Sequence, residues 1–149
     1  MTAKAESFLQ AVSIVDDDIV KRLFQYHDLL KEYNNHVNLI SRKDTDNIWE
    51  HHIFPSILGA VLCKIPQNAK LLDFGSGAGL PGLILKIVRP DRHIFLVDSI
   101  SKKVRFLAHV INQLQLKDAR AFSHRLTGKS PLVGLEASMD VVTVRAVSK

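Results

Sequence analysis

The most constraining feature of this chain is a short apolar segment that leads into alternating glycines. Residues 71–82 read Leu-Leu-Asp-Phe-Gly-Ser-Gly-Ala-Gly-Leu-Pro-Gly, and an apolar segment follows over 83–88. A strand, a glycine turn and a helix in this order bring backbone N–H groups close to a nucleotide-like ligand. Glycines are needed there because a Cβ would block both the tight turn and the approach of the ligand. The pattern predicts a parallel α/β fold with a ligand site at the turn.

The glycine spacing narrows the choice of ligand. In the dinucleotide fingerprint G-x-G-x-x-G, the first two glycines correspond to Gly75 and Gly77, but the third position is Leu80 and the extra glycine is Gly79. An acidic residue followed by G-x-G-x-G is the form usual in S-adenosylmethionine-dependent methyltransferases. Asp98 ends a second predicted strand at the distance where a carboxylate accepts hydrogen bonds from ribose hydroxyls. NAD sites use such a carboxylate too, so an NAD(P)-dependent oxidoreductase stays open as an alternative.

Strand-like and helix-like segments alternate along the C-terminal part of the chain. We expect strands over 70–74, 94–98, 119–123 and 140–145, helices over 81–88 and 101–115, and a loop with one short helix over 127–138. Such alternation implies a parallel sheet with right-handed crossovers. The predicted fold is a Rossmann-like α/β sheet of the class I S-adenosylmethionine-dependent methyltransferase type, with strands one to four present in the spatial order three-two-one-four.

Helical patterns dominate residues 1–66, which we expect to pack on the core formed by residues 67–149 as one structural domain. Asp16-Asp17-Asp18 can cap a helix over 19–33, because carboxylates stabilise the positive end of a helix. We expect a second helix from Thr45 or Asp46 towards His52, an interruption or kink at Pro55, and a third helix over 56–64.

The fourth predicted strand lies close to the end of the chain. In a seven-stranded methyltransferase sheet this strand is interior, yet no further strand follows it here. An uncovered apolar edge promotes aggregation. We therefore expect the N-terminal part of a longer protein, or a truncated gene product.

The composition favours a cytoplasmic protein with no membrane span and no metal. The chain has 149 residues, 46% of them hydrophobic, and it contains neither a span of ~20 apolar residues nor a signal-peptide segment. The single cysteine, Cys63, excludes an internal disulfide, and its apolar surroundings over 57–65 predict a buried side chain. His51 and His52 are adjacent and point to different faces of a helix, which argues against a shared zinc ion.

Basic residues are concentrated in the segment 102–129. The chain carries a net charge of +5, and this segment contains seven lysines and arginines against one aspartate. A basic surface attracts phosphate backbones, although a merely solvated face is an equally good interpretation of charge alone. Together with a methyl-donor site, the charge favours RNA or DNA as the substrate.

Several further motifs resemble one family over residues 30–147. They are Tyr33-Asn34 with Val37-Asn38-Leu39, His52, the segment 73–82, Leu96-Val97-Asp98-Ser99 with Lys102-Lys103 and Phe106-Leu107, and finally residues 141–146. This ordered set resembles the bacterial 16S ribosomal RNA guanine-N7 methyltransferases, also called glucose-inhibited division protein B. The resemblance implies that S-adenosyl-L-methionine is the cofactor and that a guanine in 16S rRNA of the small ribosomal subunit is methylated at N7.

The resemblance also implies roles for individual residues. The cofactor-binding set it gives is Gly75, Gly77, Gly79, Leu80, Asp98, the backbone at Leu126 and Thr127, and Arg145. Asp98 would hold the ribose hydroxyls, and residues 126–127 would meet the adenine. Asn38 and His52 would position the substrate together with Arg145. Oligomeric state and the choice between naked rRNA and a ribosomal particle stay open.

The expected chemistry requires no acid or base residue. Guanine N7 carries a lone pair and no proton, so methyl transfer can rest largely on proximity and alignment. Cytosine C5 methylation would need a cysteine nucleophile, and Cys63 precedes the first strand of the sheet. A small-molecule methyltransferase would leave the basic segment unexplained. The main alternative is a truncated, non-catalytic module that binds RNA and the cofactor.

Overall fold

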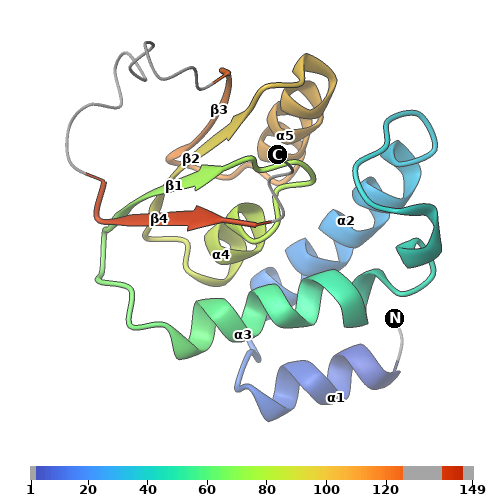
Figure 1. Cartoon of the computed structure of the whole chain (residues 1–149). Coiled ribbons are helices and arrows are strands. Elements are labelled where there is room, and N and C mark those ends of the chain that lie inside the picture. Colours follow the sequence, from blue (N-terminus) through green and yellow to red (C-terminus); the bar gives the residue numbers. More distant parts are fainter. Residues whose placement is uncertain (1–2, 126–138, 146–149) are drawn as a thin grey trace.

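Four parallel strands form the single sheet of the computed structural model, which describes residues 3–125 and 139–145 (Figure 1). They are β1 (Lys70–Phe74), β2 (His93–Asp98), β3 (Ala119–Ser123) and β4 (Val141–Val144). Their spatial order is β3-β2-β1-β4. The predicted Rossmann-like α/β layout and the order three-two-one-four are confirmed.

The strand register places the glycine turn at the carboxyl end of the sheet. Phe74, the last residue of β1, pairs with Val97 of β2 and Val144 of β4. Beyond Phe74, the Gly75 and Ser76 N–H groups both donate to the Val97 carbonyl, at 2.8 and 2.9 Å. The turn is thus fastened to the neighbouring strand as soon as β1 ends.

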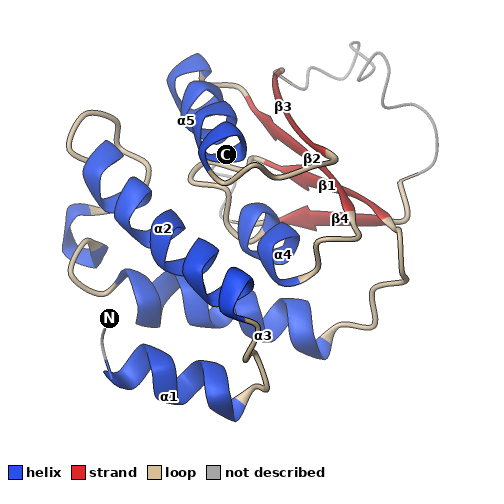
Figure 2. Cartoon of the chain, turned by 180° about the vertical axis from the view of Figure 1, so that it is seen from behind, coloured by secondary structure: helices blue, strands red, loops and turns tan. Residues whose placement is uncertain are grey.

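Helices cover one face of the sheet. From behind, α4 (Gly82–Val88) and α5 (Ser101–Gln113) lie against the strands, and α2 (Asp17–Tyr33) crosses outside them (Figure 2). Every residue of α4 is buried, including Lys86. The Lys86 ammonium donates to the carbonyls of Pro90 and Arg92, and burial lowers the pKa of Lys86. None of the helices among the described residues is both long and apolar enough to cross a membrane.

The predicted cap and end of α2 are confirmed, although the helix starts at Asp17, two residues before the predicted start. The Asp16 carboxylate accepts hydrogen bonds from the N–H groups of Asp18 and Ile19, at 2.9 and 3.1 Å, which satisfies donors that have no partner inside the helix. The helix ends at Tyr33, next to Asn34. A further helix, α1 (Ala3–Ala11), was not predicted from the sequence.

The interruption expected at Pro55 is wrong, and the alternative of a kink there stays a prediction. A 3₁₀ turn, η1 (Arg42–Asp44), is followed by a π-helical turn, η2 (Trp49–Ile53), which continues directly into α3 (Phe54–Leu62). The Phe54 N–H donates to the Trp49 carbonyl five residues earlier. This wider turn accommodates a proline that has no N–H to donate. The helix also begins near Ile48 rather than after a cap at Thr45 or Asp46.

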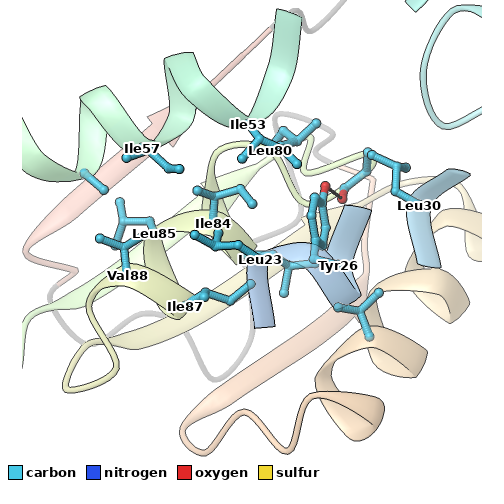
Figure 3. Close-up of a cluster of buried hydrophobic side chains, with 14 of the residues drawn as sticks. Leu23, Tyr26, Leu30, Ile53, Ile57, Leu80, Ile84, Leu85, Ile87 and Val88 are labelled. Carbon is cyan, nitrogen blue, oxygen red and sulfur yellow. Dashed lines mark hydrogen bonds between the residues drawn. The ribbon is translucent and has the colours of Figure 1, made fainter. Parts of the chain in front are cut away.

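The N-terminal helices pack on the core through a continuous apolar cluster. Figure 3 shows Leu23 of α2 beside Ile84 and Ile87 of α4, with Tyr26 and Leu30 following along α2 in the same buried cluster. Each such side chain, when fully buried, contributes roughly 1.5–3 kcal/mol relative to its exposed state. This cluster holds the helices against the glycine turn, which leads directly into α4.

Strand β4 forms the edge of the sheet that lies opposite β3. Among the described residues β4 pairs only with β1, and its Val142 and Val144 side chains are 56% and 60% exposed. The uncovered edge expected for this strand is therefore present within the described part of the chain.

Cys63 is exposed, so its predicted burial is wrong. Helix α3 ends at Leu62, which places Cys63 beyond the packed turns of the helix.

Candidate active site

A cavity of about 200 Å³ lies between the glycine turn and the N-terminal helices. Its walls are residues 75–78 and Leu80 of the turn, Leu39, Ile40 and His52 opposite them, and the two cations Lys103 and Arg145. Ligands of open α/β sheets bind at the carboxyl ends of the strands, and this cavity has that position. The structure therefore brings together five of the residues predicted from the sequence, namely Gly75, Gly77, Leu80, His52 and Arg145.

The glycines of the turn serve different purposes. Gly77 and Gly79 both have positive φ angles, +54° and +83°, which favour glycine. A Cβ on Gly77 would meet only the Gly75 carbonyl, at 3.9 Å, whereas a Cβ on Gly79 would lie 2.3 Å from Leu83 Cδ1 and 3.1 Å from Leu107 Cδ2. Gly77 keeps space open beside the cavity, and Gly79 lets α4 and α5 approach the turn. Gly79 is absent from the cavity wall, and its role in cofactor binding stays a prediction.

Gly82 was missed as a functional position in the sequence. A Cβ there would lie 2.5 Å from Leu96 Cδ2 and 2.6 Å from Asp73 Oδ2. Close packing of the helix on the strand is the task of the third glycine in the dinucleotide fingerprint. Here Gly82, as the first residue of α4, performs it, and its position after Pro81 is the sequence signal that was available.

Asp73 ties three elements of the core together. Its side chain is buried, with Oδ2 accepting from the Gly82 N–H at 3.2 Å and Oδ1 accepting from the Thr143 hydroxyl at 2.8 Å. Burial raises the pKa of Asp73, although the hydrogen bonds from Thr143 and Gly82 oppose the shift. The carboxylate thus links β1 to α4 and β4, and both of its oxygens are engaged inside the protein.

Asp98 holds the turn from the end of β2. Its Oδ2 accepts from the Gly77 N–H and its Oδ1 from the Ile100 N–H, both at 2.9 Å. A carboxylate has about four acceptor positions, so each oxygen retains one for a further donor. Asp98 is largely buried and is not part of the cavity wall; its predicted contact with ribose hydroxyls stays a prediction.

Tyr26 and Asn34 shape the cavity from the N-terminal helices, and sequence reasoning missed both. The buried Tyr26 hydroxyl donates to the Ala78 carbonyl at 2.8 Å, and burial raises the pKa of Tyr26 so far that it stays a neutral donor. Asn34 Oδ1 accepts from the N–H groups of Leu39 and Ile40, at 2.9 and 3.0 Å. A hydroxyl within the apolar row of α2 was the available signal for Tyr26.

Asn38 is exposed and is not part of the cavity wall. The side chain that organises this turn is that of Asn34, four residues earlier. The predicted role of Asn38 in positioning the substrate stays a prediction. Leu126 and Thr127, predicted to meet the adenine, and the loop expected over 127–138 lie outside the described residues.

Four side chains form what we call the polar corner of the cavity: Asp44, His51, His52 and Arg145. His51 Nδ1 lies 2.7 Å from Asp44 Oδ1, and His52 Nε2 lies 3.4 Å from Asp44 Oδ2. Arg145 Nη2 lies 3.3 Å from His52 Nδ1 and donates to the His51 carbonyl at 3.3 Å. The two histidines were expected to face apart; both reach Asp44 because that carboxylate presents one oxygen to each.

The surroundings of His52 and of Asp44 each lower the pKa of the side chain, but for different reasons. Burial, followed by the nearby Arg145 charge, lowers the pKa of His52, although Asp44 opposes the shift. Hydrogen bonds from His51 and Ser41 lower the pKa of Asp44. Near neutral pH the corner therefore consists of an ionised Asp44, a neutral His52 and a charged Arg145. Among the described residues no group of three or more histidine, cysteine or acidic side chains is arranged to hold a metal ion.

The basic residues of segment 102–129 that the structure describes lie on α5 and after it in the chain. Lys103 lines the cavity itself, while Lys102 and Arg105 of the same helix are exposed. Lys117, Arg120 and Arg125 are also exposed. The positive charge predicted for this segment is therefore at the surface, with Lys103 in the cavity wall and Lys117 and Arg120 at the amino end of β3, away from the cavity.

The sheet order, the glycine turn and the site at the strand ends define a class I methyltransferase fold. A family model described as rRNA small subunit methyltransferase G matches residues 19–149, and the chain belongs to this family.

Curated relatives point to the same family. "Ribosomal RNA small subunit methyltransferase G" of Desulfotalea psychrophila is 40% identical over 129 residues, covering 86% of this chain and 58% of the relative. The protein of the same name from Geobacillus thermodenitrificans is 36% identical over 125 residues, covering 84% and 52%. The protein of that name from Moorella thermoacetica is 46% identical over 92 residues, covering 62% and 38%. The chain thus spans little more than half the length of the first two relatives.

Proposed function

We propose that this chain forms the S-adenosylmethionine site of a cytoplasmic enzyme that methylates N7 of a guanine in 16S rRNA. The observation that carries the proposal is the glycine turn at the carboxyl ends of β1 and β2, where Gly77 leaves open space and the Asp98 carboxylate fixes its N–H at 2.9 Å. Membership of the rRNA small subunit methyltransferase G family supplies the reaction class.

The cavity supplies the groups that such a donor needs. Gly75 and Gly77 allow close approach to the backbone, and Leu39, Ile40 and Leu80 give apolar surface. Asp98 keeps acceptor positions for ribose hydroxyls. When bound, S-adenosylmethionine supplies an activated methyl group; the residues of this chain would hold it in line with the acceptor nitrogen.

The ionisable groups around the cavity suit an acceptor that carries no proton. Its titratable wall residues are His52, Lys103 and Arg145. His52 lies between Asp44 and Arg145, while the Asp73 and Asp98 carboxylates accept hydrogen bonds from within the protein. No free base therefore faces the cavity from the described residues, and guanine N7 needs none. Alignment of donor and acceptor can supply several kcal/mol of the barrier.

The position of Cys63 disfavours cytosine C5 as the acceptor. The side chain lies in a separate groove of about 540 Å³ between α3 and β4, and it is not part of the wall beside the glycine turn. A thiol at that place does not reach a base held in the cavity. The exposed cations around α5 favour a phosphate-bearing acceptor, because such surfaces bind nucleic-acid backbones in a salt-dependent manner.

A two-stage experiment tests the proposal. Calorimetry with S-adenosylhomocysteine should show binding, and incubation with labelled S-adenosylmethionine and 16S rRNA from a strain that lacks the modification should yield N7-methylguanine. Absence of binding by a folded chain would refute the donor site. Label on another atom or on no RNA would refute the assigned reaction.

A second candidate is a module that binds the donor and RNA without transferring the methyl group. The chain's coverage of only 52–58% of two relatives favours it, since residues completing the acceptor pocket can lie in the remainder. Donor binding without transfer by this chain, together with transfer by a full-length relative, would identify this second function.

A further inference from the structure

The polar corner contains a carboxylate that the proposed reaction does not use. Asp44, in η1, lies on the far side of His52 from Arg145 and is not part of the cavity wall. It nevertheless contacts both histidines of η2 and accepts a hydrogen bond from the Ser41 hydroxyl at 3.0 Å. Three contacts around one half-buried carboxylate indicate a role in arranging the groups that do face the cavity.

The hydrogen-bond chemistry of Arg145 fixes the state of His52. A guanidinium can only donate, so His52 Nδ1, 3.3 Å from Arg145 Nη2, must be the unprotonated nitrogen to accept from it. The proton of the neutral ring then lies on the buried Nε2, which makes no hydrogen bond in the structure but lies 3.4 Å from Asp44 Oδ2, where the carboxylate charge acts on it. A carboxylate beside Nε2 favours that tautomer, because the second partner of an imidazole selects which nitrogen carries the proton.

We propose that Asp44 is a positioning residue: it holds His52 in the tautomer that accepts from Arg145, and so keeps the Arg145 guanidinium at the cavity mouth to bind an oxyanion of the ligand. The inference rests on the proposed function for the identity of that ligand. Two sources of the oxyanion are available there, the carboxylate of the donor's methionine moiety and a phosphate of the RNA.

The charges around His52 determine how the contact between His52 and Arg145 changes with pH. Asp44 from η1, His51 from η2 and Arg145 after β4 all act on it, and Lys103 of α5 lines the same cavity. Protonation of Nδ1 removes one of the two acceptors of Arg145, leaving the His51 carbonyl, and places two positive charges side by side. Arg145 is therefore held more firmly above the pKa of His52 than below it.

The first measurement is the tautomer of His52 in the unmodified chain, read from its ¹⁵N chemical shifts at pH 8. We expect the proton on Nε2. A proton on Nδ1 would overturn the proposal without any variant. In Asp44→Asn we expect a mixture of tautomers and a lower pKa for His52, since the opposing carboxylate charge is gone.

The matched control is Glu50→Gln. Glu50 lies in the same helical turn as the histidines and pairs with Lys4 at 2.9 Å, so this variant removes one carboxylate and one ion pair without touching His52 directly. We expect it to leave the His52 tautomer unchanged. An equal change of tautomer in both variants would show that Asp44 acts only through general charge, and would overturn the proposal.

Ligand binding then identifies the oxyanion. We expect Asp44→Asn to weaken binding by roughly three- to tenfold, as for the loss of one hydrogen bond of ordinary strength. If the oxyanion is the donor carboxylate, S-adenosylhomocysteine loses affinity and 5′-methylthioadenosine, which lacks that group, does not. If the oxyanion is an RNA phosphate, an rRNA fragment binds more weakly. The slope of log affinity against log salt concentration then falls by the amount expected for about one phosphate contact.

A double-mutant cycle separates positioning from a general structural role. In an Arg145→Ala background, Asp44→Asn should have no further effect on affinity, because the group it positions is absent. The same loss in both backgrounds would overturn the proposal. If the unmodified chain bound neither the nucleosides nor RNA, the proposed function would fail, and the tautomer measurement would still decide whether Asp44 arranges His52.

Discussion

The two walls of the cavity are built on opposite principles. On the sheet side, the buried Tyr26 hydroxyl donates to the Ala78 carbonyl of the glycine turn and the buried Asp73 carboxylate accepts from the Gly82 N–H. Gly79 and Gly82 leave no room for a Cβ. At the polar corner, the exposed Arg145, which follows β4, meets His52 and the His51 carbonyl of η2 at 3.3 Å. The sheet wall therefore makes a large contribution to folding stability, whereas the polar corner can change with little effect on it. Substitutions on the two walls should separate stability from ligand binding.

The largest effect is expected for Gly79→Ala. The new Cβ would collide with Leu83 and Leu107 at a φ of +83°, so overpacking of about 1–3 kcal/mol adds to a backbone cost of about 1–2 kcal/mol. We expect the free energy of unfolding to fall by about 3 kcal/mol, measured by urea denaturation.

Gly59→Ala and Gly77→Ala are the matched controls for that substitution. Gly59, within α3, has nothing within 4 Å of the added Cβ, so alanine should raise stability by up to about 1 kcal/mol. Gly77→Ala should cost only the backbone strain of about 1–2 kcal/mol but reduce donor affinity, because its Cβ would enter the open space beside the cavity. Equal destabilisation at Gly77 and Gly79 would contradict the division of roles between them.

The next effect concerns the Asp73 carboxylate. Asp73→Ala leaves the Gly82 N–H and the Thr143 hydroxyl without their acceptor in a buried position, and each unsatisfied group costs about 1–3 kcal/mol. We expect a loss of about 2–3 kcal/mol in unfolding free energy. Asp73→Asn should cost less than about 1 kcal/mol, because its carbonyl can accept from Gly82 while the Thr143 hydroxyl rotates to accept from the amide. Thermal denaturation of the two variants tests this, and similar losses would show that the negative charge itself is required.

A smaller effect is expected for Tyr26→Phe, which removes one hydrogen bond between α2 and the glycine turn. The Ala78 carbonyl would lose the donor that lies 2.8 Å away, at a cost of about 1 kcal/mol. Hydrogen exchange of the amides at residues 75–80 should become faster, since α2 would hold the turn less firmly. Unchanged exchange would mean that packing of the tyrosine ring, rather than its hydroxyl, keeps the turn in place.

The same contrast explains what the sequence could predict. The glycine turn and the cap at Asp16 depend on local residue patterns, which are visible along the chain, and the strand order follows from the type of fold that those patterns indicate. Tyr26 acts on a carbonyl that the fold brings to it from 52 residues away. Asn34 and Asp44 act on residues only three to eight positions away, through turns whose side-chain contacts no residue pattern specifies. Pro55 misled the helix prediction because a π-helical turn accommodates it. Cys63 misled the burial prediction because apolar sequence neighbours do not reveal where a helix ends.

The smallest expected effect on stability, and the sharpest contrast between the walls, concerns His52. Its pKa in the folded chain is lowered from the ordinary value of 6.5, mainly by burial. The unfolded chain then binds more protons than the folded chain just below pH 6.5, so the stability due to neutral His52 is present above that pH and is lost as pH falls through the lowered pKa. We expect the difference in unfolding free energy between the unmodified chain and His52→Asn to bend in this range, because the other histidines are common to both. A difference that stays flat from pH 8 to pH 5 would show that folding does not shift the pKa of this ring. A bend accompanied by a parallel loss of donor or RNA affinity would connect protonation of His52 to the weaker hold on Arg145, while the glycine turn on the opposite wall stays folded.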